Sequence, residues 1–215
     1  MKRMFEALVK EALDQEFSGW DFSWMNGRYF ESEPFWNYRK LVLEQMMNAE
    51  AMLDMGTGGG EFLASLPGLP ENTVATESYP PNIPIATQRL QPIGVKVVPV
   101  EDEHALPLPD EMFDLVINRH ESYDLSEVWR ILKPGGIFLT QQVGPRNCVQ
   151  LNQYLNAPLD PGTAKWSLKL EKQAFTKGGF TVITSHEQIL ESNFYDIGAV
   201  VFYLKVIEWQ IEGFS

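Results

Sequence analysis

Apolar and polar residues alternate along most of this chain in a way that predicts a sheet with connecting helices. From residue 51 onward, short apolar runs are separated by stretches of helical spacing and by glycine or proline turns. This alternation is typical of parallel strands in an α/β fold. The expected strands are AMLDM (51–55), NTVATE (72–77), VKVVPV (95–100), FDLVINR (113–119) and GIFLTQQV (136–143). The expected helices cover about residues 61–66, 82–91, 124–132, 147–155 and 165–177.

The first 50 residues have helical spacing that is interrupted by aromatic side chains. Residues 3–16 predict one helix, and NYRKLVLEQMM (37–47) predicts a second one shortly after Pro34. The segment between them is irregular, and residues 1–50 hold 10 of the 26 aromatic residues of the chain. We predict that residues 1–50 form an N-terminal helical lid over a core of residues 51–215, within a single domain overall.

Two further apolar runs near the C-terminus break the alternation. FTVITSHEQIL (180–190) and IGAVVFYLKVI (197–207) both look like strands, and only ESNFYD separates them. A parallel crossover needs a dozen or more residues, so this connection is too short for one. The two runs must therefore pair antiparallel or lie in different places.

Composition and charge narrow the class of protein. The 215 residues are 44% hydrophobic, which suffices for a packed core, and the formal net charge of −12 disfavours nonspecific binding to nucleic acid. A single cysteine, Cys148, and three scattered histidines form no metal-binding spacing, so we expect no metal site. No apolar run approaches the roughly 20 residues that span a bilayer, and MKRMFEALVK differs from a signal peptide. We expect a soluble, cytoplasmic protein, and the sequence leaves its oligomeric state open.

The segment LDMGTGGGEFL (53–63) carries the clearest chemical signal. An apolar strand runs into four glycines before a helix resumes, and such glycines let the backbone approach a ligand. Glu77 ends the next strand, about 20 residues on, where an acid can accept hydrogen bonds from ribose hydroxyls. Asp102 follows the third strand. These spacings predict a cofactor that contains adenosine.

Two other nucleotide-binding loops fit these residues poorly. The dinucleotide fingerprint requires a very small residue at its sixth position, which is Glu61 when counted from Gly56. Asp54 would also face a pyrophosphate with no cation in the loop, whereas a cationic cofactor without phosphates tolerates this acid. No Gly-Lys-Ser or Gly-Lys-Thr follows the glycines, which excludes a P-loop.

Four motifs, in this order and spacing, resemble those of the class I S-adenosylmethionine-dependent methyltransferases. They are LDMGTGGGEFL, the acid that ends VATE, EDEHALPLPDEMFDLVINR and ILKPGGIFLTQQV, and the resemblance covers nearly all of residues 50–207. In motif style it is closest to small-molecule methyltransferases of the quinone-biosynthesis type. It implies S-adenosyl-L-methionine as cofactor and a Rossmann-like sheet of seven strands, mostly parallel, whose antiparallel last strand comes from the C-terminal pair of runs.

The same resemblance implies the residues of the cofactor site. Glu77 falls on the ribose-binding acid, and Ser78 and Tyr79 fall on the adenine side. Asp102 would accept a hydrogen bond from the adenine amino group, and Glu103 would offer its backbone amide to the ring. The full predicted set is Asp54, Gly56, Gly58, Gly60, Glu77, Ser78, Asp102, Glu103 and Asn118.

The residues that contact the methyl acceptor are harder to infer. The methyl donor is already activated, and proximity alone can lower the barrier by about 7–11 kcal/mol, so the reaction does not require a catalytic base. His120, after the fourth strand, is the candidate general base, and the alternative is that it packs without titrating. Glu121 and Gln142 are candidate substrate contacts, although Glu121 equally suits a solvent-facing position. Only one of Gln141 and Gln142 can face the cleft, since they are adjacent on a strand. Cys148 lacks the preceding proline of a cytosine methyltransferase nucleophile.

Three functions from different classes remain open at this point. The leading one is methyl transfer to a small molecule, because aromatic walls in residues 1–50 suit an apolar or planar acceptor. Those aromatic residues equally suit the packing of the lid on the sheet. The second function is methylation of an RNA base, which the acidic net charge disfavours. The third is cofactor binding without catalysis, since methyl transfer requires no signature base.

Overall fold

The computed structural model describes residues 2–159 and 166–214, and its largest element is a parallel sheet of five strands. Their spatial order is β4-β3-β2-β5-β6, so the direction of winding reverses between β2 and β5. The strands are β2 (Ala51–Met55), β3 (Asn72–Glu77), β4 (Lys96–Pro99), β5 (Phe113–Arg119) and β6 (Leu132–Gln141). Each coincides with one of the five apolar runs in residues 51–143, which confirms a Rossmann-like α/β fold. Ligands of such sheets bind beyond the carboxyl ends of the strands, at the reversal.

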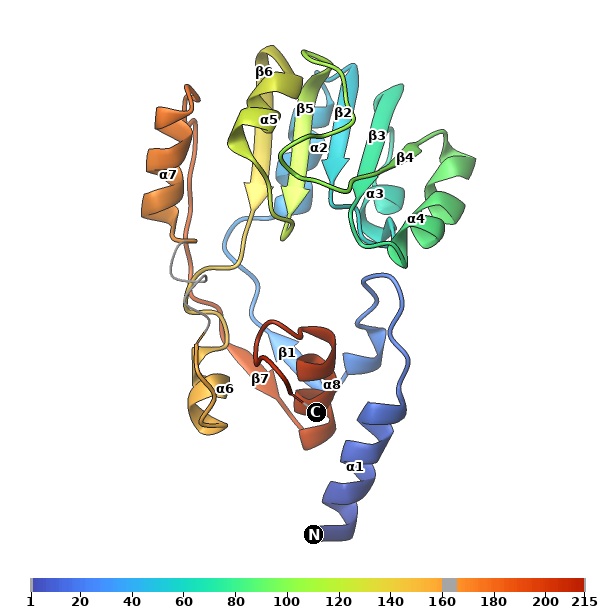
Figure 1. Ribbon diagram of the computed structural model, residues 1–215, viewed down its shortest axis with the longest axis vertical. Coiled ribbons are helices and arrows are strands. Elements are labelled where there is room, and N and C mark those ends of the chain that lie inside the picture. The colour runs from blue at the N-terminus through green and yellow to red at the C-terminus, as the bar shows by residue number, and fades with distance from the viewer. Residues whose placement is uncertain (1, 160–165, 215) are drawn as a thin grey trace.

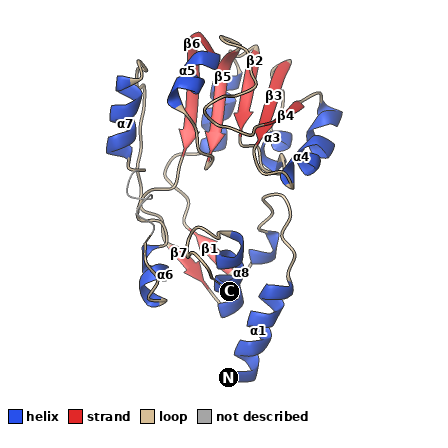
Figure 2. Ribbon diagram, in the orientation of Figure 1, coloured by secondary structure: helices blue, strands red, loops and turns tan. Residues whose placement is uncertain are grey.

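Helices cover both faces of the sheet (Figures 1 and 2). On one face lie α2 (Tyr38–Met46), α3 (Glu61–Ser65) and α4 (Asn82–Leu90), the last extended by the 3-10 turn η2 (Gln91–Ile93). On the other face lies α5 (Leu125–Ile131), and α7 (Leu168–Lys177) runs beside β6. These helices fall within a few residues of the predicted ranges.

Two apolar clusters hold these layers together, and the pleat of the strands explains their composition. On β2, Met52 points into the cluster under α2, α3 and α4, while its neighbour Leu53 points into the cluster under α5. Leu115 and Val116 divide in the same way on β5. All four side chains are at most 1% exposed. Strands buried on both faces read as nearly continuous apolar runs, as these do.

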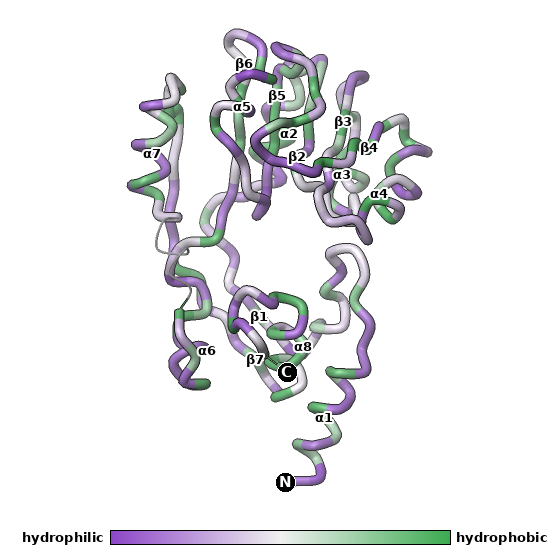
Figure 3. Tube along the Cα trace, in the orientation of Figure 1, coloured by the Kyte–Doolittle hydropathy of each residue, from purple (hydrophilic) through white to green (hydrophobic). Residues whose placement is uncertain are grey.

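A smaller assembly lies beyond the carboxyl ends of β2, β5 and β6 (Figure 1). Its third apolar cluster contains Ala12, Met25 and Phe202 and so joins the two ends of the chain. In Figure 3, α1 carries hydrophobic segments between hydrophilic ones, as expected for a helix that packs by one face. The elements of the smaller assembly are α1 (Lys2–Asp14), the 3-10 turn η1 (Ser23–Met25), β1 (Tyr29–Glu31), α6 (Val149–Tyr154), β7 (Ser192–Phe194) and α8 (Ile197–Val206).

The C-terminal pair of strands is the main error of the sequence prediction. IGAVVFYLKV forms the helix α8, and residues 180–191 form no strand within the part of the chain that the structure describes. The nearby β7 pairs antiparallel with β1, far from the main sheet. A short run that is apolar throughout fits a buried helix as well as a strand. The missed signal is Asp196, whose side chain caps α8 by accepting a hydrogen bond from the Ala199 amide at 2.9 Å.

The N-terminal segment divides between the two assemblies. Both predicted helices are present, but α2 packs under the sheet through Tyr38 and Val42, whereas α1 packs against α8. The division of the chain at residue 50 into a lid (1–50) and a core (51–215) stays a prediction. None of the helices in the described residues has the length and apolar character needed to cross a bilayer.

Candidate cofactor site at the carboxyl edge of the sheet

The glycine loop after β2 adopts a backbone that side chains disfavour. Gly56, Gly58 and Gly60 have φ angles of +73°, +62° and +80°. A Cβ on Gly56 would lie 2.4 Å from the Cβ and Cγ atoms of Glu121, and one on Gly60 would lie 2.8 Å from Leu90. The loop therefore requires glycine for two reasons, its dihedral angles and the close approach of neighbours.

Glu77, at the end of β3, lies beside this loop and is only 4% exposed. Its carboxylate accepts a hydrogen bond from the Tyr79 amide at 2.8 Å. Burial raises the pKa of this carboxyl, while the backbone amides of Tyr79, Gly58 and Ser78 act in the opposite direction. The predicted ribose acid and the predicted glycine loop are thus neighbours in the folded chain.

One cavity of about 360 Å³ brings together most of the predicted cofactor residues. That volume falls in the range of small-molecule sites. Of the predicted residues, it is lined by Gly56, Glu77, Ser78, Asp102, Glu103 and Glu121. Its wall does not include Asp54, Gly58, Gly60, Asn118, His120, Gln142 or Tyr79. The remaining lining residues are Met55, Thr76, Val100, Glu101, His104, Leu106, Ser122, Tyr123 and Asp124.

The chemistry of this lining fits S-adenosylmethionine. Six carboxylates face the cavity, and no lysine or arginine of the described ranges 2–159 and 166–214 lines it. Carboxylates accept hydrogen bonds from hydroxyl and amino groups and attract a sulfonium, whereas they repel the phosphates of a dinucleotide or ATP. The absence of a side chain at Gly56 leaves room for the Glu121 side chain, which lies against the loop at this end of the cavity. Glu77, Asp102 and Glu103 all line this cavity, and the cofactor contacts that the resemblance implies for them stay predictions.

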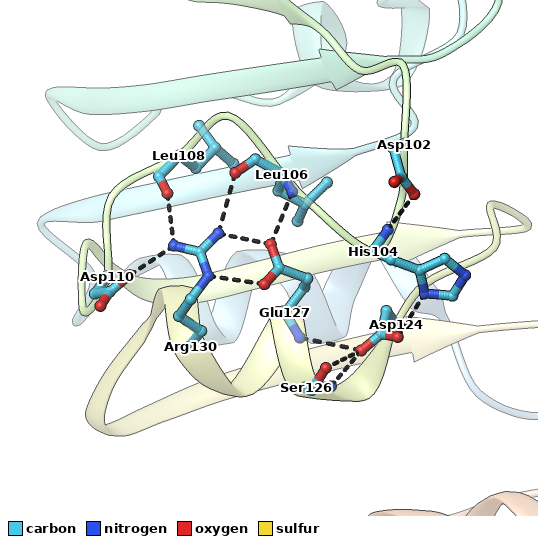
Figure 4. Close-up of polar contacts among 9 residues, drawn as sticks. All are labelled: Asp102, His104, Leu106, Leu108, Asp110, Asp124, Ser126, Glu127 and Arg130. Atoms are coloured by element: carbon cyan, nitrogen blue, oxygen red, sulfur yellow. Dashed lines mark hydrogen bonds and ion pairs between the residues drawn. The ribbon is translucent and has the colours of Figure 1, made fainter.

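The loop that carries Asp102 and Glu103 is fastened to α5 (Figure 4). Arg130 donates hydrogen bonds to the carbonyl oxygens of Leu108 and Leu106 at 2.7 and 3.1 Å, and Glu127 accepts one from the Leu106 amide at 2.7 Å. Arg130 also pairs with Asp110 at 2.7 Å. Helix α5 therefore fixes the wall of the cavity opposite the glycine loop.

His104 and Asp124 extend this framework at the mouth of the cavity. The ring nitrogen Nδ1 of His104 lies 2.7 Å from the Asp124 carboxylate, and the His104 amide donates to Asp102 at 2.9 Å. Hydrogen bonds from Ser126 and from His104 lower the pKa of Asp124 to about 2, and Asp124 in turn raises the pKa of His104. Sequence reasoning missed this pair. The detectable signal was Asp124-x-x-Glu127, an N-terminal helix cap, which Asp124 forms here with α5.

Asp54 is buried behind the glycine loop and does not reach the cavity. Its carboxylate accepts a hydrogen bond from the Thr57 hydroxyl at 2.7 Å. Burial raises the pKa of Asp54 to about 6, and this hydrogen bond acts against the rise. In this arrangement Asp54 shapes the loop from within.

Asn118 and Gln142 form a hydrogen-bonded cluster at the ends of β5 and β6. The Gln142 amide nitrogen donates to Asn118 Oδ1 at 2.6 Å and to the Glu121 carbonyl at 3.0 Å. Asn118 is fully buried, and its Nδ2 donates to the same carbonyl at 3.1 Å. The neighbouring Gln141 accepts a hydrogen bond from the Trp36 indole at 2.9 Å. Both Gln142 and Asn118 therefore hold the Glu121 backbone in place, and their predicted ligand contacts stay predictions.

His120 has the strained backbone common at functional sites but is a weak base. Its φ is +67°, and its amide donates to the Gln141 carbonyl at 3.0 Å. Burial of its ring and, secondarily, the Arg119 charge lower the pKa of His120 to about 4, although the residue as a whole is exposed. The imidazole is thus neutral at pH 7, and its role as general base stays a prediction.

The smaller assembly touches the glycine loop through Trp20. A Cβ on Gly58 would lie 3.3 Å from the Cβ of Trp20. The Trp20 ring stacks parallel to Trp209 at 6.4 Å, and both rings are partly exposed, at 43% and 62%. The described residues contain no group of three or more His, Cys, Asp or Glu side chains arranged to hold a metal ion.

Comparison with known proteins points to one family. Residues 53–140 match the family model described as "Methyltransferase domain". The "Probable phthiotriol/phenolphthiotriol dimycocerosates methyltransferase 2" of Mycobacterium ulcerans is 28% identical over 126 residues, which are 54% of this chain and 48% of that protein. The chain thus spans about half the length of this curated relative.

Solved structures agree on the fold. The YcgJ protein of Bacillus subtilis superimposes with a TM-score of 0.52 at 23% identity, covering 66% of this chain and 67% of that one. A SAM-dependent methyltransferase from Aquifex aeolicus superimposes with a TM-score of 0.53 at 19% identity, covering 80% and 87%. At these identities the likeness concerns the fold.

Proposed function

We propose that residues 53–140, which match the methyltransferase domain model, form a class I S-adenosylmethionine-dependent methyltransferase domain and that the chain uses it to methylate a small-molecule acceptor. When bound, the cofactor supplies a methyl group that is already activated on a sulfonium. The observation that carries the proposal is the acidic cavity, which combines the glycine loop, Glu77 and Asp102 in one place. The choice of a small-molecule acceptor is argued from the residues around this cavity.

The residues of the cavity have separate tasks in this proposal. Glu77, buried and held by backbone amides, binds the ribose hydroxyls, and Asp102 binds the adenine amino group at the exposed end. Gly56 permits the close backbone approach. Arg130 keeps the Asp102 loop at a fixed distance from the glycine loop through its bonds to two loop carbonyls.

Alignment of donor and acceptor, more than proton transfer, accounts for the rate in this proposal. A neutral imidazole whose conjugate acid has a pKa of about 4 accepts protons weakly at pH 7, so His120 is a modest base at best. Positioning alone supplies about 7–11 kcal/mol when the reacting atoms are held in line. The strong framework of hydrogen bonds around Asn118, Gln142 and the Glu121 backbone suits such positioning.

Three observations favour a small acceptor. The smaller assembly, with the exposed Trp20 and Trp209 rings, lies beyond the carboxyl ends of the strands and offers apolar surface beside the glycine loop. The net charge of −12 repels a phosphate backbone. The relative from Mycobacterium ulcerans is named for methylating phthiotriol and phenolphthiotriol dimycocerosates.

The test combines binding with acceptor identification. Calorimetry should show micromolar-scale binding of S-adenosylhomocysteine and no binding of NADH or ATP. The protein is then incubated with methyl-labelled S-adenosylmethionine and a fractionated cytosolic extract, with Glu77→Gln as the matched control. Label should enter the small-molecule fraction with the unmodified protein, and clearly less should enter with Glu77→Gln, which weakens cofactor binding. Label in RNA or protein would refute the acceptor class, and binding of NADH without S-adenosylhomocysteine would refute the assignment of the cavity.

A further inference from the structure

Glu121 lies against the glycine loop. The chain leaves β5 at Arg119, turns at His120, whose φ is +67°, and places Glu121 over Gly56. A Cβ on Gly56 would be 2.4 Å from the Glu121 Cβ and Cγ and 2.9 Å from its Cδ, so the carboxyl group sits at the glycine-loop end of the cavity. Its Oε1 accepts a hydrogen bond from the Ser78 hydroxyl at 3.1 Å.

The Glu121 carboxylate has no cationic partner in the part of the chain that the structure describes. Glu121 forms no ion pair within residues 2–159 and 166–214, whereas Asp124 pairs with His104 and the buried Glu127 pairs with Arg130. Burial raises the pKa of Glu121, and the carboxylates of Glu77 and Glu103 act in the same direction. A poorly hydrated negative charge without a cationic partner is costly, and a cation bound beside it would offset that cost.

The methyl donor and the cofactor product of the proposed reaction differ in charge. The sulfonium of S-adenosylmethionine is positively charged, and the thioether of S-adenosylhomocysteine is neutral. Methyl transfer breaks the bond between the sulfonium sulfur and the methyl carbon, the electron pair of that bond stays on sulfur, and the acceptor gains the methyl group. Adenosine contacts at Glu77 and Asp102 are common to both forms and cannot separate them.

We propose that Glu121 is the charge-selective residue of the cofactor site, which favours the cationic methyl donor over the neutral product. This inference rests on the proposed function. It assigns Glu121 to the cofactor and not to the acceptor, and it gives the site a means of releasing its product. Attraction between unit charges at such a partly buried position is strong enough to change an affinity by about tenfold or more.

The test measures affinities without turnover. Calorimetry with the full-length protein gives the dissociation constants of S-adenosylhomocysteine, S-adenosylmethionine and sinefungin, whose amine carries the positive charge near the position of the sulfonium. The unmodified protein should bind the two cations more tightly than the neutral product. Glu121→Gln should reduce this preference by on the order of tenfold while changing the affinity for S-adenosylhomocysteine little.

Two variants complete the test. Glu71→Gln removes the same charge from an exposed turn outside the cavity lining and should leave the preference intact. Glu121→Asp keeps the charge and should retain a preference for cations, which guards against a folding defect in Glu121→Gln. Equal weakening of all three ligands by Glu121→Gln would overturn the inference and leave the proposed function standing. Absence of binding by the unmodified protein would overturn the proposed function itself.

Discussion

The carboxylate of Glu127 and the guanidinium of Arg130 form a doubly hydrogen-bonded pair on α5, with distances of 2.8 and 2.6 Å (Figure 4). The pair is more than a surface ion pair, because both partners also bind the backbone of Leu106. It therefore connects a helix on one face of the sheet to the loop that carries two predicted cofactor residues.

Arg130→Ala should destabilise the protein by about 1–3 kcal/mol, since Glu127 and two loop carbonyls lose their partner at once. Urea unfolding measures this change, and S-adenosylhomocysteine should bind more weakly because the Asp102 loop loosens. Lys10→Ala, which removes the exposed pair with Asp14, is the control and should stay within about 0.5 kcal/mol of the unmodified protein. Equal effects of the two substitutions would contradict the role given to Arg130.

Glu77→Gln should weaken S-adenosylhomocysteine binding by about 1.5–3 kcal/mol, the range for hydrogen bonds to a charged group. Calorimetry provides the measurement, and a thermal melt checks that the fold survives. Glu71→Gln makes the same substitution in the exposed turn just before the first residue of β3, and it should not alter the affinity for S-adenosylhomocysteine. An unchanged dissociation constant in Glu77→Gln would place the ribose acid elsewhere.

The raised pKa of Asp54 predicts that the stability of the protein depends on pH. Its pKa of about 6 in the folded state exceeds the unfolded value of 3.8, so the folded state binds more protons between these values and loses stability as the pH rises through them. The loss amounts to about 3 kcal/mol. Asp54→Asn removes this dependence, so its effect on the free energy of unfolding should be more favourable at pH 8 than at pH 4 by up to that amount. Urea titrations that give the same effect of Asp54→Asn at both pH values would argue against a buried carboxyl with a raised pKa.

Gly56→Ala should disrupt the cofactor loop through steric conflict. The new Cβ would meet the Glu121 side chain and carry a φ of +73°. Gly68→Ala has a similar φ of +63° but open space around it, so it isolates the dihedral cost, about 1 kcal/mol. S-adenosylhomocysteine affinity should fall in Gly56→Ala and stay unchanged in Gly68→Ala. Equal behaviour would mean that Glu121 moves aside easily.

Phe202→Ala should loosen the smaller assembly selectively. Phe202 is 1% exposed and contacts Phe17 and Trp24, so its truncation should cost about 3–5 kcal/mol within that assembly. Hydrogen exchange should increase in α1 and α8 while β2 and β5 stay protected. Tyr154→Ala, at a side chain that is 85% exposed, should change neither the stability nor the hydrogen exchange of α1 and α8. Uniform loss of protection would show that both assemblies unfold together.

The sequence by itself determined the main sheet and the position of its ligand loop. Strands such as β2 and β5 are buried on both faces, so their apolar runs are continuous and the glycines after β2 stand out. The spacing from that loop to Glu77 spans one helix and one strand, and the spacing from Glu77 to Asp102 again spans one helix and one strand with a 3-10 turn between them. This local geometry is readable without tertiary contacts.

Only the tertiary structure decided how the chain ends are used. The run 197–206 is apolar on nearly all sides, so periodicity could not separate a strand from a buried helix; packing against α1, at the opposite end of the chain, selects the helix. The contacts of Glu121 with Gly56 and of Asp124 with His104 are equally invisible in sequence. They join residues from different connections of the sheet, and the order of the strands in space, which no local pattern encodes, brings those connections to the same edge.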